Sequence, residues 1–372
     1  VRYASAAYGV SMIDSAESLQ VFGKNLNVIP VIPASSKKAR ERKISKYVGI
    51  KQDNIVSMTK PGGSMDVLGH VLAVDKRKNL LSGKGAVVLA IRGTYTLSGL
   101  LVDGSAYSEE FCDGYAHSGI AQVATKLWEE VKEAVVKALL DNPGLDLVIT
   151  GHSLGAGSAA LLALKLKYED ILAKENEYLK DVQIRCFAFA PPPVYFQGHE
   201  NEKINRAMKD TYPFIHEEDC VPFASVDAIR RIADTMVDVD KYPKGLLFSS
   251  PLRATGLRPI PDDLKKIIMD NDREVPPAPD SQKLAIPAPF VMWLRQTSED
   301  KHNRPMYNAM FCRPQAEGNA LGTNDLNIQL SPDMIAHHMN PQYERAIMSV
   351  RQQMLHKEEA FAFPTNPEEE YH

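Results

Sequence analysis

The sequence predicts a protein of the α/β class, in which a mostly parallel β-sheet carries helices on both faces. Three observations lead to this prediction. Strand-like and helix-like segments alternate along most of the chain, a serine between two glycines interrupts a long apolar run, and a proline-rich stretch precedes the last strand-like segment. At 372 residues the chain can bury one large core, so we expect 1–372 to form a single domain.

The charge balance and the cysteine positions limit the classes of protein to which the chain can belong. Lys and Arg number 43 and Asp and Glu 47, so the net charge is −4 and there is no global signature of nucleic-acid binding. Cys112, Cys186, Cys220 and Cys312 are far apart and compatible with reduced thiols. No signal peptide is visible and the chain begins at Val1, so we expect a trimmed N-terminus or a piece of a longer protein. A cytoplasmic or peripheral membrane location is compatible with these features.

The N-terminal segment, 1–60, is expected to be partly helical and basic. Its run SKKARERKISK, 36–46, holds six Lys or Arg residues against the single acid Glu41. Such a run is usually a solvated helix face, and contact with an anionic membrane surface is the alternative.

The regular elements follow in order. The runs 68–76 and 85–93 are apolar strands joined by a polar turn, and 118–140 has the apolar spacing of an amphipathic helix. Two further buried strands are expected at 182–190 and 212–219. A late strand within 283–296 and a C-terminal helix over 340–359 complete the pattern.

A proline-rich insertion interrupts this alternation. Nine of the 24 prolines lie between Pro243 and Pro289, which excludes a regular sheet or a long helix there. We expect the segment 241–324 to be an irregular insertion that covers the core, either as a mobile lid or as a fixed cap.

The apolar run LVITGHSLGAGSAALLAL, 147–164, is the most informative stretch. It is shorter than the roughly 20 residues that a membrane span needs, and glycines interrupt it. Its first part predicts a β-branched buried strand and its last part a buried helix. Ser153 therefore lies at a tight strand-to-helix turn, the context of a nucleophile elbow, where Gly151 and Gly155 avoid steric clashes. A serine that only caps the helix is the alternative interpretation.

A serine nucleophile requires a base and an acid, which in this fold class follow it in the order acid, then histidine. Asp219 ends the predicted strand 212–219 and is the preferred acid, with Asp238 and Asp240 as alternatives. The adjacent His337 and His338, after the last predicted strand, are the preferred candidates for the base. The other histidines that follow Ser153 are His199, His216, His302, His356 and His372.

The oxyanion of an acyl-transfer reaction requires two hydrogen-bond donors. Leu154 can supply its backbone N–H because it directly follows the nucleophile. Gly93 and Thr94 follow a buried strand, and Thr94 offers an N–H and a hydroxyl. An ordinary turn at Gly93–Thr94 is the alternative.

Taken together, the segments VVLAIRGTYTLSGLLVD, VITGHSLGAGSAAL, FAPPPV, EEDCVP and SPDMIAHHMNPQY resemble the class 3 lipases. The elbow and the AIRGT loop look most like the diacylglycerol-lipase branch, and the opening RYASAAYG resembles the segment that precedes the catalytic domain there. The resemblance covers 1–240 and 325–350 in the family's order. It implies an α/β-hydrolase fold that cleaves glycerolipid esters at a lipid–water interface, without a cofactor or a metal, and it indicates neither a nucleic acid nor a protein partner.

Carried over to this chain, the resemblance implies a triad of Ser153, Asp219 and His338, with Thr94 and Leu154 lining the oxyanion hole. His338 is preferred over its neighbour because the family has a histidine five residues before a tyrosine, here Tyr343.

Two residues depart from the family pattern. His337 replaces a common acidic residue, and Cys220 replaces a usual Pro or Val. The first departure leaves the choice between the two histidines to be tested.

The expected function is hydrolysis of di- or triacylglycerol esters through an acyl-enzyme on Ser153. A phospholipase A1, a galactolipase and a soluble carboxylesterase are the alternatives within enzymes. A non-catalytic lipid-binding protein on the same fold is the alternative from another class.

Overall fold

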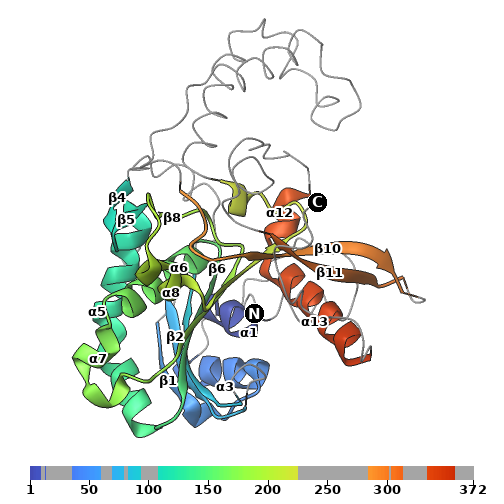
Figure 1. Ribbon diagram of the computed structural model, residues 1–372. Helices are drawn as coiled ribbons and strands as arrows, with labels where there is room; N and C mark the ends of the chain where they lie inside the picture. Colours follow the sequence, from blue (N-terminus) through green and yellow to red (C-terminus); the bar gives the residue numbers. More distant parts are fainter. Residues whose placement is uncertain are drawn as a thin grey trace, which may run out of the picture.

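The computed structural model describes residues 1–9, 13, 36–59, 69–78, 83–93, 108–224, 284–300, 303–312 and 333–356. Within these ranges the chain forms a large sheet between two layers of helices (Figure 1). In spatial order its strands are β1 (Ile55–Met58), β2 (His70–Asp75), β3 (Ala86–Ile91), β6 (Asp146–His152), β7 (Ile184–Phe189), β9 (Thr211–His216), β10 (Val291–Glu299) and β11 (Pro305–Cys312).

The centre of this sheet is parallel. Strands β3, β6, β7, β9 and β10 run parallel to one another. At the two ends, β1 and β2 pair antiparallel, β2 pairs antiparallel with β3, and β11 pairs antiparallel with β10. Only Met292–Leu294 of β10 pair with β9, so β10 and β11 continue beyond the sheet as a two-stranded ribbon, on the right in Figure 1. The mostly parallel sheet that the sequence predicts is confirmed.

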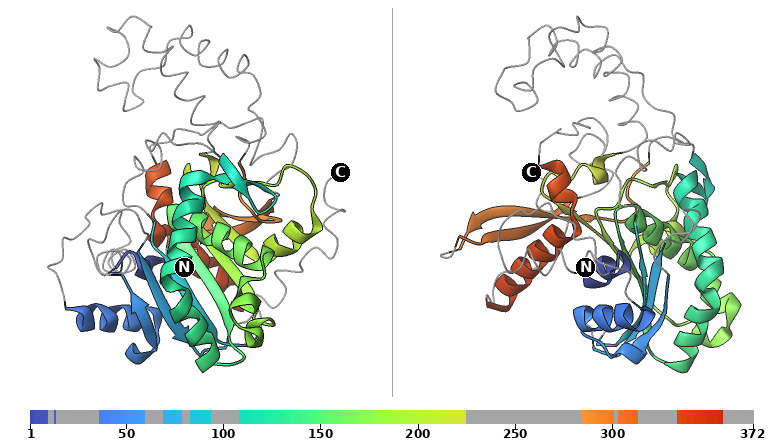
Figure 2. Two further views of the ribbon diagram at one scale, coloured as in Figure 1. Left: turned by 90° about the vertical axis from the view of Figure 1, so that its left-hand side faces the viewer. Right: turned by 180° about the vertical axis from the view of Figure 1, so that it is seen from behind.

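Helices cover both faces of the sheet, as predicted, and Figure 2 shows the two layers from further directions. On one face lie α5 (Ser118–Asp141) and α6 (Leu154–Tyr168), with α7 (Ile171–Glu175) and α8 (Glu202–Met208) beside them. On the other face lie α1 (Arg2–Ala7), α3 (Lys37–Val48) and α13 (Asn340–His356), and the short helix α12 (Met334–His338) precedes α13. Single 3₁₀ turns occur at Gln52–Asn54, Glu177–Leu179 and Val221–Phe223.

Strand β3 shows why the apolar runs are continuous rather than alternating. All six of its side chains are buried. Leu89 and Ile91 contact the cluster under α5 and α6, whereas Ala90 contacts the cluster under α1 and α3. A strand buried on both faces has no solvent side on which polar residues would be favoured.

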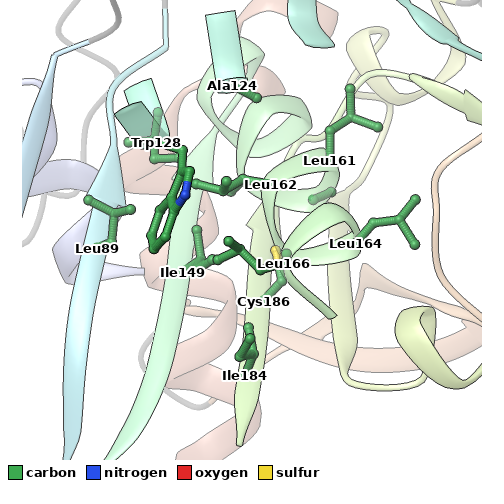
Figure 3. Close-up of a cluster of buried hydrophobic side chains, with 14 of the residues drawn as sticks. Leu89, Ala124, Trp128, Ile149, Leu161, Leu162, Leu164, Leu166, Ile184 and Cys186 are labelled. Atoms are coloured by element: carbon green, nitrogen blue, oxygen red, sulfur yellow. The ribbon is translucent and has the colours of Figure 1, made fainter. Parts of the chain in front are cut away.

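The core under α5 and α6 is the larger of these clusters. Trp128 of α5 lies beside Leu162 of α6 and Ile149 of β6 (Figure 3), and all three are buried. Helix α6 is buried along nearly its whole length, because small residues let it lie directly on β6 and β7. The helix therefore has a fixed position relative to the strand that precedes it.

Several elements differ from the sequence predictions or extend them. A small antiparallel sheet of β4 (Ser108–Phe111), β5 (Gly114–His117) and β8 (Tyr195–Phe196) was not predicted. The part of the 241–324 segment that the structure describes includes β10 and β11, which belong to the main sheet. The prediction of a lid or cap over 241–324 is therefore wrong for β10 and β11, and the rest of that segment, 241–283, 301–302 and 313–324, lies outside the described residues.

The basic run of the N-terminal segment forms α3, as expected. Its apolar side, with Ile44, Tyr47 and Val48, is buried. Four of the six cations, Lys37, Lys38, Arg42 and Lys46, are exposed, and Arg40 and Lys43 are half-buried. Among the helices that the structure describes, none has the length and apolar character needed to cross a membrane.

The packing of α5 leads to a prediction about stability. Trp128 is 3% exposed, so Trp128→Ala should lower the free energy of unfolding by about 3–5 kcal/mol through lost burial and a cavity. Tyr178 is 89% exposed, so Tyr178→Ala should change it by less than about 0.5 kcal/mol. Urea denaturation of both variants measures this difference, and equal effects would contradict the packing of α5 on α6.

Candidate active site

Ser153 lies on the turn that joins β6 to α6. Its backbone has φ 58° and ψ −130°, a strained conformation for a residue with a side chain. A Cβ on Gly151 would lie 2.2 Å from the carbonyl oxygen of Gly155, and one on Gly155 would lie 2.4 Å from that of Ile91. The expected strand–turn–helix context is confirmed. The alternative interpretation as a helix cap is wrong, because the Ser153 side chain makes no capping hydrogen bond.

The structure brings Ser153, His338 and Asp219 together from three distant parts of the chain. His338 Nε2 lies 3.0 Å from Ser153 Oγ, and His338 Nδ1 lies 3.0 Å from each carboxylate oxygen of Asp219. This is the arrangement in which an imidazole can take a proton from a serine while a carboxylate orients the ring. Ser153 and His338 are largely buried, and Asp219 is fully buried.

Asp219 is held by several donors at the end of β9. The Val221 N–H donates to its Oδ1 at 2.9 Å, and the Tyr343 hydroxyl donates to its Oδ2 at 2.6 Å. Burial alone would raise the pKa of the Asp219 carboxyl. The charge of His338 and the hydrogen bonds from His338, Tyr343 and Val221 outweigh burial and lower this pKa below its usual range. The carboxylate therefore stays ionised beside the imidazole.

Tyr343 has a role that the sequence analysis missed, since there it served only to set the register of the histidine. Its hydroxyl accepts from the backbone N–H of His216 at 3.0 Å while it donates to Asp219. Tyr343 lies in the first turn of α13 and is fully buried, and its spacing from His338 alone did not reveal this contact with Asp219.

The two adjacent histidines have different surroundings. His338 points to Ser153 and Asp219, whereas the His337 ring accepts a long contact of 3.4 Å from the Glu218 N–H. The geometry therefore favours His338 as the base, in the register that the family resemblance implies.

The oxyanion side of the site is described in part. Leu154 is the first residue of α6, where N–H groups have no partner within the helix. Gly93, at the end of β3, abuts the elbow: a Cβ there would lie 2.4 Å from the Tyr8 hydroxyl and 2.5 Å from the His152 carbonyl oxygen. Thr94, the other predicted oxyanion residue, lies outside the described residues.

Two further histidines, missed as site residues, lie next to the triad. His152 precedes Ser153, and His216 ends β9. Burial, with a smaller contribution from His338, lowers the pKa of His152 to about 3. Burial, with a smaller contribution from His337, lowers the pKa of His216 to about 4. Both imidazoles are therefore neutral at neutral pH.

The other residues that the sequence singled out do not join the triad or lie outside the described residues. His199 is exposed on the surface, and burial raises the pKa of the Cys220 thiol to about 11, so that it is protonated at neutral pH. Asp238, Asp240, His302, His372 and the side chain of His356 lie outside the described residues.

A cavity of about 480 Å³ lies at the opposite end of the sheet, between the end of α6 and the start of β7. The Lys167 ammonium on its wall pairs with Asp210 at 2.9 Å, and Lys180 pairs with Glu177 at 2.9 Å. The triad is elsewhere, so this cavity is separate from the candidate active site.

The comparison with known proteins confirms the resemblance to the class 3 lipases, since residues 88–228 match the model of the family Lipase (class 3). Over 187 residues the chain is 34% identical to diacylglycerol lipase-beta of Mus musculus, covering 47% of this chain and 25% of that one. Over 164 residues it is 29% identical to secreted mono- and diacylglycerol lipase A of Penicillium cyclopium, covering 42% of this chain and 46% of that one. The chain thus spans a quarter to a half of these relatives.

Among solved structures, a fungal lipase aligns over 90% of this chain and 91% of its own, at a TM-score of 0.46 and 16% identity.

The geometry predicts which histidine is essential. His338→Ala should lower kcat by about 10⁴-fold or more, and Ser153→Ala/His338→Ala should be hardly worse, because triad members act as a unit. His337→Ala should stay within about tenfold of the wild type, since its ring does not face Ser153. Rates of hydrolysis of a chromogenic ester measure this difference. If His337→Ala is inactive and His338→Ala is active, the base is His337 and the family register is off by one residue.

The neutral histidines predict how stability depends on pH. In the unfolded chain both titrate near 6.5, whereas in the folded protein they do so at about 3 and about 4. Between these values the unfolded state binds more protons, so the free energy of unfolding should fall as the pH is lowered from about 6.5 toward 4, by up to about 1.4 kcal/mol per pH unit for each histidine.

Urea denaturation across this pH range measures the slope. His216→Asn should flatten it, and the exposed control His199→Asn should leave it unchanged. An unchanged slope in His216→Asn would show that His216 is protonated in the folded protein.

Proposed function

We propose that this chain, whose residues 88–228 match the class 3 lipases, is a serine lipase that hydrolyses ester bonds of di- or triacylglycerols at a lipid–water interface. The observation that carries the proposal is the contact of His338 with both Ser153 and Asp219, at 3.0 Å on each side, on a strained elbow. The relatives named as mono- and diacylglycerol lipases support glycerolipids as the substrate class.

In the first half of the proposed reaction, Ser153 Oγ attacks the ester carbonyl carbon while His338 Nε2 accepts the hydroxyl proton. The carbonyl oxygen becomes an oxyanion, and the N–H groups of Leu154 and Thr94 are the proposed donors to it. The imidazolium then gives the proton to the leaving alcohol as the ester C–O bond breaks. The acyl group remains on Ser153.

In the second half, water attacks the acyl carbon and His338 Nε2 accepts the proton of the water. The proton returns to Ser153 Oγ as the fatty acid leaves, so the enzyme is regenerated. Asp219 stays ionised throughout, holds the His338 Nδ1–H and stabilises the imidazolium. Its full burial strengthens this electrostatic contribution.

A fluorophosphonate probe tests the nucleophile. It should label the wild type at Ser153, and Ser153→Ala should abolish labelling and lower kcat by about 10⁴-fold or more. Ser158→Ala is the matched control, because Ser158 is buried in the same helix and makes no hydrogen bond among the described residues. It should be labelled like the wild type. Labelling that persists in a folded Ser153→Ala protein would rule out this serine.

A substrate panel tests the ester class. Diacylglycerol, triacylglycerol, monoacylglycerol, phosphatidylcholine, a galactolipid and a short-chain soluble ester are assayed with one enzyme preparation. The proposal expects the highest kcat/KM on a di- or triacylglycerol. A preference for phosphatidylcholine or the galactolipid would replace it with a phospholipase or a galactolipase, and a preference for the soluble ester would replace it with a carboxylesterase.

A further inference from the structure

The helix that carries the catalytic histidine is unusually short. Helix α12 comprises Met334–His338 and ends at the residue that must face Ser153. Helices much shorter than about 12 residues are marginal on their own in water. The position of His338 therefore depends on contacts that its helix makes with other parts of the molecule.

Two of these contacts come from imidazoles. The carbonyl groups in the last turn of a helix accept no hydrogen bond from N–H groups of the same helix. At the end of α12, His152 Nε2 lies 2.7 Å from the His338 carbonyl oxygen, and His216 Nδ1 lies 3.1 Å from the His337 carbonyl oxygen. Two consecutive carbonyls are thus held by two histidine rings from different strands.

These contacts define which ring nitrogen carries the proton. A carbonyl oxygen only accepts hydrogen bonds, so His152 Nε2 and His216 Nδ1 must be donors. The other nitrogen of His152 lies 3.1 Å from the Tyr8 hydroxyl, which can donate to it. The other nitrogen of His216 is buried without a hydrogen-bond partner among the described residues, which favours a bare nitrogen over a buried N–H. Both rings are neutral, in opposite tautomers.

We infer that His152 and His216 are positioning residues that hold the backbone of His337 and His338 through single N–H donors and so set the distance from His338 Nε2 to Ser153 Oγ. The inference rests on the proposed role of His338 as the base. Its structural basis is that each ring belongs to a strand end that already carries another member of the triad. His152 is adjacent to Ser153, and His216 is three residues before Asp219.

A neutral donor is required at these places because a proton arrives on His338 during catalysis. The rings of His152 and His338 are 4.7 Å apart between centroids, so a charged His152 would oppose the imidazolium. The groups that face His152 are His338, Asp219, Tyr8 and Tyr343.

The groups that face His216 are His337, Asp219, Arg345, Tyr307 and Tyr343. Burial lowers the pKa of both rings far enough that neither competes for the proton. A lysine or an arginine could supply the same N–H only together with a charge.

Matched amide and aliphatic variants test the inference. H152Q keeps an N–H donor at the place of the His152 Nε2–H, and H216N keeps one at the place of the His216 Nδ1–H. H152L and H216L remove the donor. With p-nitrophenyl butyrate as the substrate, H152L and H216L should lower kcat by about 10²-fold with little change in KM, because misplacing the base by about 1 Å costs on that order. H152Q and H216N should recover most of the loss. The control H199L, at an exposed histidine, should keep the wild-type kcat.

Nitrogen NMR of the wild type, labelled with ¹⁵N in histidine, reads the tautomers directly. We expect a neutral Nε2–H ring for His152 and a neutral Nδ1–H ring for His216 at pH 7. A charged ring or the opposite tautomer at either position would overturn the inference. So would wild-type kcat in both Leu variants, or folded H152Q and H216N proteins as slow as their Leu counterparts.

Failure of the proposed function has a different signature. A wild-type protein that a fluorophosphonate does not label at Ser153 would remove the catalytic role of His338, while the NMR result on the two rings would stand by itself.

Discussion

The strained turn at Ser153 is the constraint on which the rest of the site depends. A left-handed backbone at a residue with a side chain persists only where the surrounding structure enforces it. Here the enforcement is backbone packing, since Gly151 and Gly155 approach each other and the end of β3 so closely that neither position has space for a Cβ. The turn places Ser153 next to His338 and directly before α6, whose first N–H groups have no partner within the helix.

The parallel sheet then brings the other two residues to the serine. Parallel strands end at one edge of a sheet, and in such sheets the site lies beyond their carboxyl ends. Strand β6 ends at the elbow, and β9, separated from it by β7 alone, ends just before Asp219. His338 arrives from far along the chain, after β10 and β11 have completed the sheet. Helix α13 follows it on the opposite face, where Tyr343 donates to Asp219, the partner of His338.

A buried carboxylate is costly unless it is paired and hydrogen-bonded, and the site meets this requirement with neutral and charged partners in different roles. Tyr343 and the Val221 N–H satisfy Asp219 without charge, which leaves the interaction with His338 as the one that changes when a proton moves. The neighbouring His152 and His216 add donors near the same centre without adding charge. Among the described residues, the side chains other than His338 that hydrogen-bond to Asp219 or to the His337 and His338 carbonyls are therefore polar but uncharged.

The sequence by itself determined the class of the fold and pointed to Ser153 as the proposed nucleophile, because both depend on local patterns. Continuous apolar strands, an amphipathic helix and two glycines around Ser153 each reflect a physical requirement within a few residues. The resemblance to a family was needed to choose Asp219 and to prefer His338 over His337, since chain order and turn composition alone left alternatives open. Only the tertiary structure decided the roles of Tyr343, His152 and His216, because hydrogen bonds between residues more than 100 positions apart leave no periodic signal in the chain. It also decided that the late strand within 283–296 begins at Val291 and forms a ribbon with β11, since pairing at the edge of a sheet depends on which strands are already in place.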